Sequence, residues 1–214
     1  MKKRKQIYFD CWNTLFFNNL NPHPFFLFAE KLGQDWTDPQ YVETTRSIFM
    51  TKKHVDNKAP ICALLEKLNI KKSDELIIQL EELLNSAEKG AEPFEETLTV
   101  LDELSKKFQL IMVTNVDYNS YNHLNKKYKI EKYFDKSITS FDLGILKPNP
   151  EFLKLAVKKV NGSIEDSCLI GDSEKEDIAM ADAMGMPSIL INRKKKYLKS
   201  NKVIHSLDDL HDIL

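Results

Sequence analysis

Polar residues that could carry out chemistry follow several short apolar runs of the sequence. They are Asp10, Thr114, Asn115, Lys147, Asp172 and Asp177. Three crowded carboxylates repel one another unless a cation lies among them, and hard oxygen ligands select Mg²⁺. A lysine and a threonine facing such a cation suit a phosphate group, because they spread its negative charge. We therefore expect a magnesium and phosphate site, provided that the fold brings these six residues together.

The alternation of elements after residue 90 indicates how they meet. Apolar, β-branched runs predict strands at 6–10, 110–114, 137–139, 167–171 and 187–192, and helical patterns at 95–107, 120–129, 150–160 and 175–185 separate the later strands. This order predicts an α/β fold with a doubly wound parallel sheet. Ligands bind at the carboxyl ends of the strands in such sheets, which is where the candidate residues lie.

The segment from residue 16 to residue 90 has a different pattern. After turn-forming residues at 18–24, apolar positions at helical spacing predict four helices, at 25–32, 38–49, 61–68 and 73–87, and a second turn-forming stretch follows at 90–93. We therefore expect a core made of residues 1–15 and 91–214, interrupted by an all-helical insertion at 16–90.

Composition excludes several functional classes. The 214 residues carry a net charge of −1, with 42% hydrophobic and 29% charged residues, as in ordinary globular proteins. Balanced charge argues against a nucleic-acid partner, and the dense basic run at 193–199 is interpreted as a solvated loop. No apolar stretch approaches a membrane span, and the basic start lacks a secretory apolar region. Three scattered cysteines fit a cytoplasmic protein, and nothing fixes an oligomeric state.

Four segments, in order, carry a family resemblance. Residues 9–15, 113–115, 147–150 and 170–178 resemble the four motifs of the haloacid dehalogenase-like hydrolase superfamily, as do residues 181–186 that follow the last motif. The match extends from residue 6 to residue 192, nearly the whole chain. The resemblance implies a Rossmann-like core, with the insertion at 16–90 acting as a cap that closes over the site and selects a small phosphorylated substrate.

The resemblance also implies roles for individual residues. Asp10 corresponds to the nucleophile that attacks phosphorus and forms an aspartyl-phosphate. Thr114 and Lys147 correspond to the groups that hold the transferring phosphoryl, and Asn115 lies beside them. The implied ligands of Mg²⁺ are Asp10, the backbone carbonyl of Trp12, Asp172 and Asp177.

Trp12 departs from the family pattern. Phosphatases of the family carry a second aspartate there, which protonates the leaving group, and an indole cannot replace it. Loss of a general acid typically costs about 10²–10⁴ in rate. Asp117, three residues after Thr114, is a conceivable substitute, although a turn-forming aspartate explains it equally well.

Three functions are compatible with Trp12. The first is a Mg²⁺-dependent phosphatase that uses another acid or acts on good leaving groups. The second is a 2-haloacid dehalogenase-like enzyme, because those enzymes have an aromatic residue in place of the second aspartate. However, they need no metal, use an arginine near the cap, and lack the Gly-Asp form of the fourth motif that is present here as Gly171-Asp172. Arg46 is the arginine available in the insertion, and its position there is not obviously suitable. The third is a catalytically weak protein that binds a phosphate ligand or regulates.

Overall fold

The computed structural model describes residues 5–193 and 202–214. Its main sheet has six strands in the order β5-β4-β1-β6-β7-β8, and every neighbouring pair is parallel. The strands are β1 (Gln6–Phe9), β4 (Gln109–Thr114), β5 (Lys136–Thr139), β6 (Ser167–Gly171), β7 (Ser188–Ile191) and β8 (Val203–Ile204). The central strand β1 lies between β4 and β6, so the carboxyl ends of these three strands adjoin at one edge.

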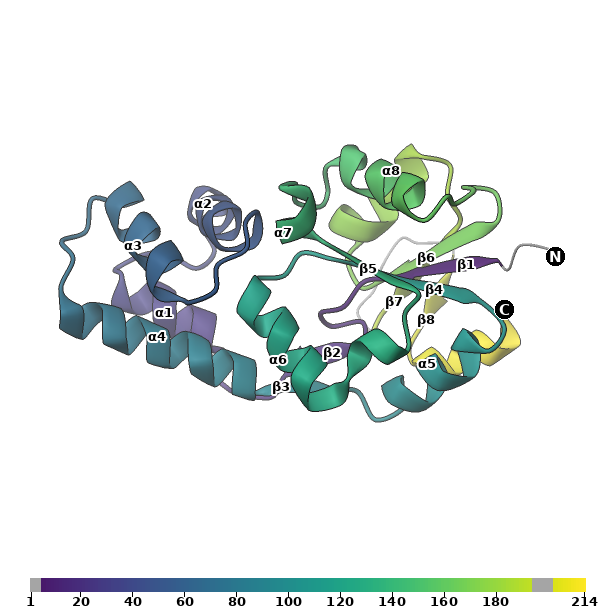
Figure 1. The fold of residues 1–214 in the computed structure, drawn as a ribbon, viewed down its shortest axis with the longest axis horizontal. Helices are drawn as coiled ribbons and strands as arrows, with labels where there is room; N and C mark the ends of the chain where they lie inside the picture. The colour runs from purple at the N-terminus through teal and green to yellow at the C-terminus, as the bar shows by residue number, and fades with distance from the viewer. Residues whose placement is uncertain (1–4, 194–201) are drawn as a thin grey trace.

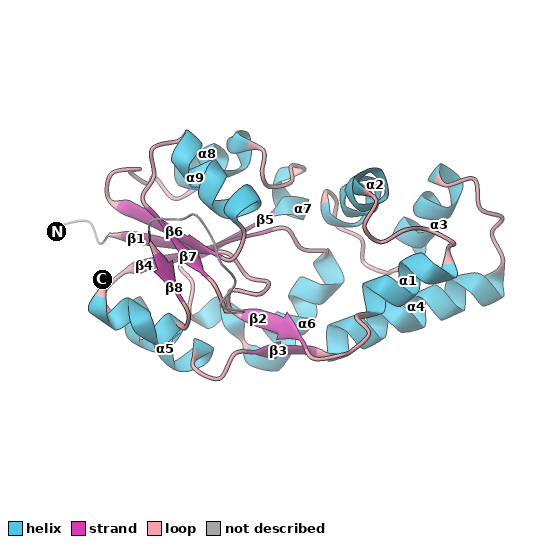
Figure 2. Ribbon diagram, turned by 180° about the vertical axis from the view of Figure 1, so that it is seen from behind, coloured by secondary structure: helices cyan, strands magenta, loops and turns pink. Residues whose placement is uncertain are grey.

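Helices cover both faces of this sheet (Figures 1 and 2). One face carries α7 (Ser140–Leu143), α8 (Pro150–Lys159) and α9 (Ala179–Ala183), and the other carries α5 (Thr97–Ser105), α6 (Tyr118–Tyr128) and a 3₁₀ helix at Leu207–Asp212. Side chains of one strand alternate between the two cores: Ile7 and Phe9 pack with α5 and α6, whereas Tyr8 packs with α8 and α9. The prediction of a doubly wound α/β fold is confirmed.

Four further helices lie beyond the carboxyl end of β1 (Figure 1). They are α1 (Pro24–Lys31), α2 (Pro39–Met50), α3 (Lys58–Lys67) and α4 (Asp74–Lys89). The side chains of Asp38 and Ser73 accept hydrogen bonds from the first turns of α2 and α4, which fixes where these helices begin. The four helices enclose their own apolar cluster, which includes Phe28, Leu64 and Leu80.

A two-stranded antiparallel ribbon connects the helical segment to the sheet. It pairs β2 (Phe16–Asn18) with β3 (Ala91–Pro93), on either side of the four helices. The expectation of irregular loops was wrong here, because three-residue strands are too short to show alternation and contain turn-forming residues. The amide of Asn18 also donates to the carbonyl of Ala87 in α4, 2.7 Å away.

Smaller elements also differ from the sequence expectations. The helix expected at 175–185 begins with a π-helical turn at Glu174–Ile178, and α7, β8 and the 3₁₀ helix were not expected. Arg193 is not solvated: it donates to the carbonyl of Thr14 and pairs with Glu96 at 2.8 Å. The remainder of the basic run, 194–199, and the first four residues lie outside the described residues. Within the described ranges, no helix is long and apolar enough to cross a membrane.

Candidate active site

Lys147 lies between two carboxylates at the carboxyl edge of the sheet. Its ammonium donates to Oδ1 of Asp10 at 2.6 Å and to Oδ1 of Asp177 at 2.7 Å, and it also reaches the carbonyl of Val113 at 3.2 Å. The side chains of all three charged residues are at least nine-tenths buried. Asp10 follows β1, Lys147 follows α7 and Asp177 lies in the π-helical turn after β6, so three separate chain segments build the cluster.

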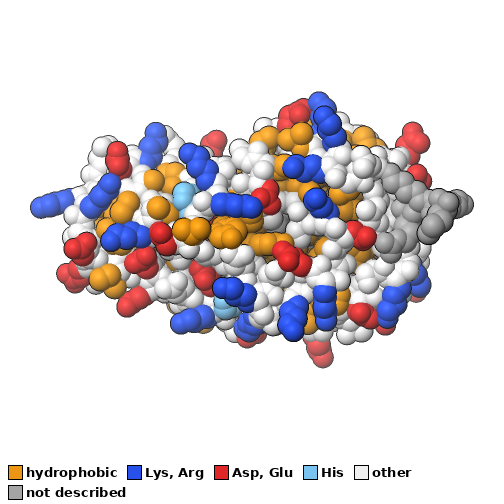
Figure 3. All heavy atoms as spheres, in the orientation of Figure 1, with side chains coloured by type: hydrophobic (Ala, Val, Ile, Leu, Met, Phe, Trp, Pro, Cys, Tyr) orange, Lys and Arg blue, Asp and Glu red, His pale blue; other side chains and the backbone are white. Residues whose placement is uncertain are grey.

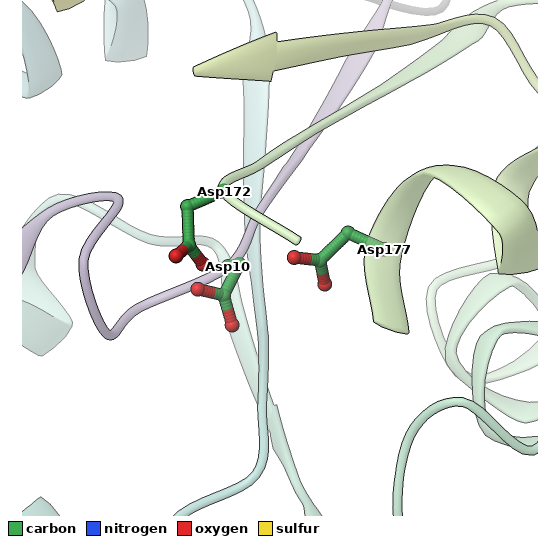
Figure 4. A group of neighbouring side chains, drawn as sticks. All are labelled: Asp10, Asp172 and Asp177. Atoms are coloured by element: carbon green, nitrogen blue, oxygen red, sulfur yellow. The ribbon is translucent and has the colours of Figure 1, made fainter. Parts of the chain in front are cut away.

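Asp172 adds a third carboxylate to this group. Figure 4 shows the carboxyl groups of Asp10, Asp172 and Asp177 turned toward one another, and one oxygen of each lies within 4.8 Å of the others. This is a set of hard oxygen ligands, which suits a divalent cation such as Mg²⁺. The residues present therefore fit the metal that the sequence predicts.

Burial and mutual repulsion make the carboxyl groups of this cluster weak acids. Burial raises the pKa of Asp10 to about 7, and the charges of Asp177 and Asp172 add to this effect, although Lys147 opposes it. Burial and Asp177 likewise raise the pKa of Asp172 to about 6. Burial alone would lower the pKa of Lys147, but Asp10 and Asp177 outweigh burial and raise that pKa above its usual range. One ammonium is thus too little charge for three carboxylates, which favours binding of a cation.

Neighbouring residues hold the cluster in place. The hydroxyl of Thr14 donates to Oδ2 of Asp10 at 3.2 Å, so both carboxylate oxygens of Asp10 accept a hydrogen bond. The backbone N–H of Ser173 donates to Oδ2 of Asp177 at 3.2 Å. A side chain at Gly171 would collide with the Asp177 carboxylate, so the glycine allows that close approach.

The structure gives Asn115 a positioning contact. Its side-chain oxygen accepts from the backbone N–H of Lys147 at 2.9 Å, and its amide donates to the carbonyl of Lys147 at 3.0 Å. This reciprocal pair fixes the Lys147 loop against the end of β4. Thr114 is fully buried beside it, and its hydroxyl lies 3.4 Å from the carbonyl of Asn115.

A cavity of about 480 Å³ opens between the site and the four helices. Trp12, Arg46, Asn115 and Asp117 line it, so the residue that departs from the family pattern faces this cavity. Two contacts join the helical segment to helices of the core: Lys53 pairs with Asp142 of α7 at 2.8 Å, and the side-chain amide of Asn119 in α6 donates to Oδ1 of Asn57 at 2.9 Å.

Arg46 lies close to the carboxylate and lysine cluster, although its position in the sequence did not indicate a place at the site. Its guanidinium donates two hydrogen bonds to Glu176, at 2.6 and 2.8 Å, and Glu176 also accepts from Asn115 at 3.4 Å. Glu176 was not predicted as a site residue, although it precedes Asp177 in the fourth motif, because no sequence pattern links it to an arginine 130 positions earlier.

Asp117 lies in the cavity wall and begins α6. Its carboxylate accepts from the backbone N–H of Ser120 at 2.8 Å, and burial raises its pKa. Glu88 of α4 lines the same cavity, and burial raises its pKa too.

Cys11 follows Asp10 directly but has the properties of an inert cysteine. Its side chain is buried, and burial together with the charge of Asp10 raises the pKa of its thiol well above the usual range.

The fold and the site together define a class of protein: a parallel α/β sheet with an acid-rich, lysine-containing site at its carboxyl edge. The family model of haloacid dehalogenase-like hydrolases matches residues 5–185. The chain therefore belongs to the haloacid dehalogenase-like hydrolases, as the four sequence motifs predicted.

Two curated relatives that the chain matches are named as phosphatases. The chain is 33% identical over 90 residues to the glyceraldehyde 3-phosphate phosphatase of Methanocaldococcus jannaschii, a match covering 40% of each chain. It is 25% identical over 127 residues to the pyrophosphatase PpaX of Bacillus mycoides, covering 58% of this chain and 59% of the relative. The chain thus spans between about two fifths and three fifths of the length of these relatives.

Solved structures share the fold over the whole chain, each with a TM-score of 0.67. A HAD phosphatase from Thermococcus onnurineus is 20% identical and a 2-haloacid dehalogenase from Pseudomonas syringae is 23% identical, and each match covers 98% of this chain and 97% of the other. YfnB from Bacillus subtilis, solved with magnesium bound, is 21% identical, with 99% of both chains covered. Since both a phosphatase and a dehalogenase match equally well, the fold alone does not select the reaction.

Proposed function

We propose that this protein hydrolyses a small phosphate monoester, with Mg²⁺ as cofactor and Asp10 as nucleophile. The observation that carries the proposal is the bridging of Asp10 and Asp177 by Lys147 within a cluster of three carboxylates. Phosphoryl transfer needs both a metal ion and fixed donors around the phosphate, and this cluster has residues of both kinds.

Each residue of the cluster has a part in the proposed reaction. Asp10, Asp172, Asp177 and the backbone carbonyl of Trp12 hold Mg²⁺, which neutralises charge on the phosphate when it is bound. Asp10 attacks phosphorus, the bond to the ester oxygen breaks, and the alcohol leaves with a proton from an acid of the site. Water then attacks the phosphorus of the aspartyl-phosphate, which releases inorganic phosphate and restores Asp10. Thr114 and Lys147 hold the phosphoryl group, while Asn115 positions Lys147.

Asp117 is our candidate for the acid that Trp12 cannot supply. It faces the same cavity as Trp12, follows the proposed phosphate-binding Thr114 by three residues, and is held at the start of α6. Its environment keeps the protonated form available at higher pH than for an ordinary aspartate, which suits a proton donor.

The four helices act in this proposal as a cap over the core of residues 1–15 and 91–214. They supply most of the cavity wall, and the β2–β3 ribbon joins them to the core at both crossings of the chain. Exclusion of water from the cavity would protect the aspartyl-phosphate from side reactions.

Two observations favour this function over the dehalogenase alternative. Asp172, which belongs to the metal-dependent form of the fourth motif, lies in the carboxylate cluster. Arg46 reaches the cavity, but its charge is already paired with Glu176 rather than available to a substrate carboxylate.

A panel of phosphate monoesters and 2-haloacids, assayed with and without Mg²⁺, tests the proposal. We expect Mg²⁺-dependent release of phosphate and no release of halide. Metal-independent halide release would support the dehalogenase alternative. Binding of beryllium fluoride with Mg²⁺, without turnover of any ester, would instead identify a phosphate-binding or regulatory protein.

A further inference from the structure

Six aromatic side chains form part of the wall of the cavity beside the site. The rings belong to Trp12, Phe25, Phe28, Trp36, Tyr41 and Phe49. Five of these six residues come from the helical segment, and Trp12 comes from the loop that follows the nucleophile. Aromatic surfaces at a pocket bind flat apolar groups by stacking and by removing apolar area from water.

Trp36 leaves part of this aromatic surface uncovered. It lies between α1 and α2, its rings are stacked against Phe25 and His23 at centroid distances of 6.1 and 6.2 Å, and 38% of its surface is exposed. The ring stack continues the cavity wall, so a flat ligand can extend it without displacing a packed side chain.

The charges around the cavity disfavour a second anionic group on the ligand. Of the described residues that line it, Arg46 carries the one permanent positive charge, and Glu176 pairs with it. Burial lowers the pKa of His23, which keeps that ring neutral near pH 7. The acidic side chains of the wall, Glu88 and Asp117, add no positive charge that could pair with a second anionic group.

Resting on the proposed function, we propose that the substrate is the phosphate ester of an alcohol that carries a flat aromatic ring and no second anionic group. The phosphate lies at Asp10 and Lys147, and the ring lies among Trp12, Trp36 and the neighbouring aromatic side chains. The cavity of about 480 Å³ has the size of a typical small-molecule site and exceeds what a three-carbon sugar would fill.

Ligand binding can be measured without catalysis. The chain has two tryptophans, Trp12 and Trp36, and both line the cavity, so intrinsic fluorescence reports on its occupancy. We would titrate the full chain, in Mg²⁺, with two phosphonates that cannot be hydrolysed at an ester bond: 1-naphthylmethylphosphonate and propylphosphonate. For variants that lack a tryptophan, isothermal titration calorimetry would measure the dissociation constants of the two compounds instead.

We expect the naphthyl compound to bind at least about tenfold more tightly than the propyl compound, the effect of roughly one stacking contact. Trp36→Ala should remove most of this ratio, and Trp36→Phe should retain most of it. Phe26→Ala is the matched control, because Phe26 is an exposed aromatic residue of α1 that does not line the cavity.

The outcomes separate the two proposals. Equal binding of both phosphonates, or an unchanged ratio in Trp36→Ala, would overturn the inference and leave the phosphatase function standing. Absence of binding by either compound would overturn the phosphate site and with it the inference. Selective binding of the naphthyl compound without hydrolysis of any ester would support the aromatic site and contradict the enzymatic function.

Discussion

The Lys147 ammonium lies 2.6 Å from Oδ1 of Asp10 and is almost fully withdrawn from water. It is 137 positions away in the sequence, and a loop fixed by Asn115 brings it there. The contact holds Asp10, the proposed nucleophile, in one orientation while leaving the cluster short of positive charge. This pairing underlies both the stability of the site and its proposed need for a metal ion.

Replacement of Lys147 should destabilise the protein. Lys147→Met leaves buried carboxylates without their cation, and loss of one partner of a buried ion pair typically costs about 3–5 kcal/mol. Urea unfolding without Mg²⁺ measures the change in the free energy of unfolding. Lys154→Met is the matched control, because Lys154 pairs with Glu151 at 2.9 Å on the surface and should cost under about 1 kcal/mol. Equal losses in both variants would contradict the assigned role of Lys147.

Metal-free protein should become less stable as the pH rises. The pKa of Asp10 is about 7 in the folded state and about 4 when unfolded, so the folded state retains a proton that the unfolded state loses. The contribution of Asp10 to the free energy of unfolding is fully present below a pH of about 4 and is lost as the pH rises through about 7. We expect a lower Tm at pH 7.5 than at pH 5.5 in thermal unfolding, with Asp172 adding to the effect.

Asp10→Asn provides the control for this pH dependence. Its amide is neutral throughout, so the difference in Tm between the two pH values should shrink. Mg²⁺ should raise the Tm of the wild type more at pH 7.5 than at pH 5.5, because the cation needs ionised ligands. A Tm that rises equally in both proteins from pH 5.5 to 7.5 would contradict the raised pKa of Asp10.

Restoring an acid at position 12 should raise phosphatase activity on small alkyl phosphates. In Trp12→Asp a second carboxyl group can protonate the leaving alcohol beside Asp117, so the gain should be largest in the Asp117→Asn background, up to the factor of about 10²–10⁴ that general acids typically contribute. Steady-state release of phosphate from glycerol phosphate measures the gain, and Trp12→Phe should show none. An unchanged or lower rate in Trp12→Asp would mean that the indole is built into the function of the site.

The decrease in kcat on removal of the proposed acid at position 117 should depend on the leaving group of the substrate. Asparagine is as good a helix N-cap as aspartate, so Asp117→Asn retains the start of α6 while removing the proton. We expect kcat to fall about 10²-fold or more for an alkyl phosphate, and much less for p-nitrophenyl phosphate, whose leaving group needs no protonation.

Glu88→Gln serves as the comparison for Asp117→Asn. Glu88 lies in the same cavity wall with a raised pKa, but it belongs to α4 rather than to the chain that follows Thr114. If Glu88→Gln shows the leaving-group dependence and Asp117→Asn does not, the acid has been assigned to the wrong residue.

Local sequence patterns predicted most of the fold. Apolar periodicity located the helices, and strand ends placed Asp10 and Asp172 at one edge of the sheet. The β2–β3 ribbon was missed because its strands have three residues each, and Arg193 was assigned to solvent because a contact with Glu96 depends on the tertiary fold.

The site was also predictable only in part, because some of its contacts depend on the tertiary fold. Motif order identified the residues of the carboxylate and lysine cluster. It did not show that the Asn115 side chain is already bonded to the Lys147 backbone, or that α2 carries Arg46 to Glu176. Both facts depend on how separate segments pack.

Charged side chains of both signs are interspersed on the face shown in Figure 3, in line with the balanced composition.

Hydrolysis by Asp10→Asn, compared with wild type, tests the central claim most directly. The substitution preserves the shape of the side chain and replaces the nucleophilic carboxylate with a neutral amide. Both proteins would be assayed with Mg²⁺ on the ester that the wild type turns over fastest. A covalent mechanism predicts that kcat falls to background in the variant while it remains folded by thermal unfolding. Retained turnover in folded Asp10→Asn would contradict nucleophilic catalysis by Asp10.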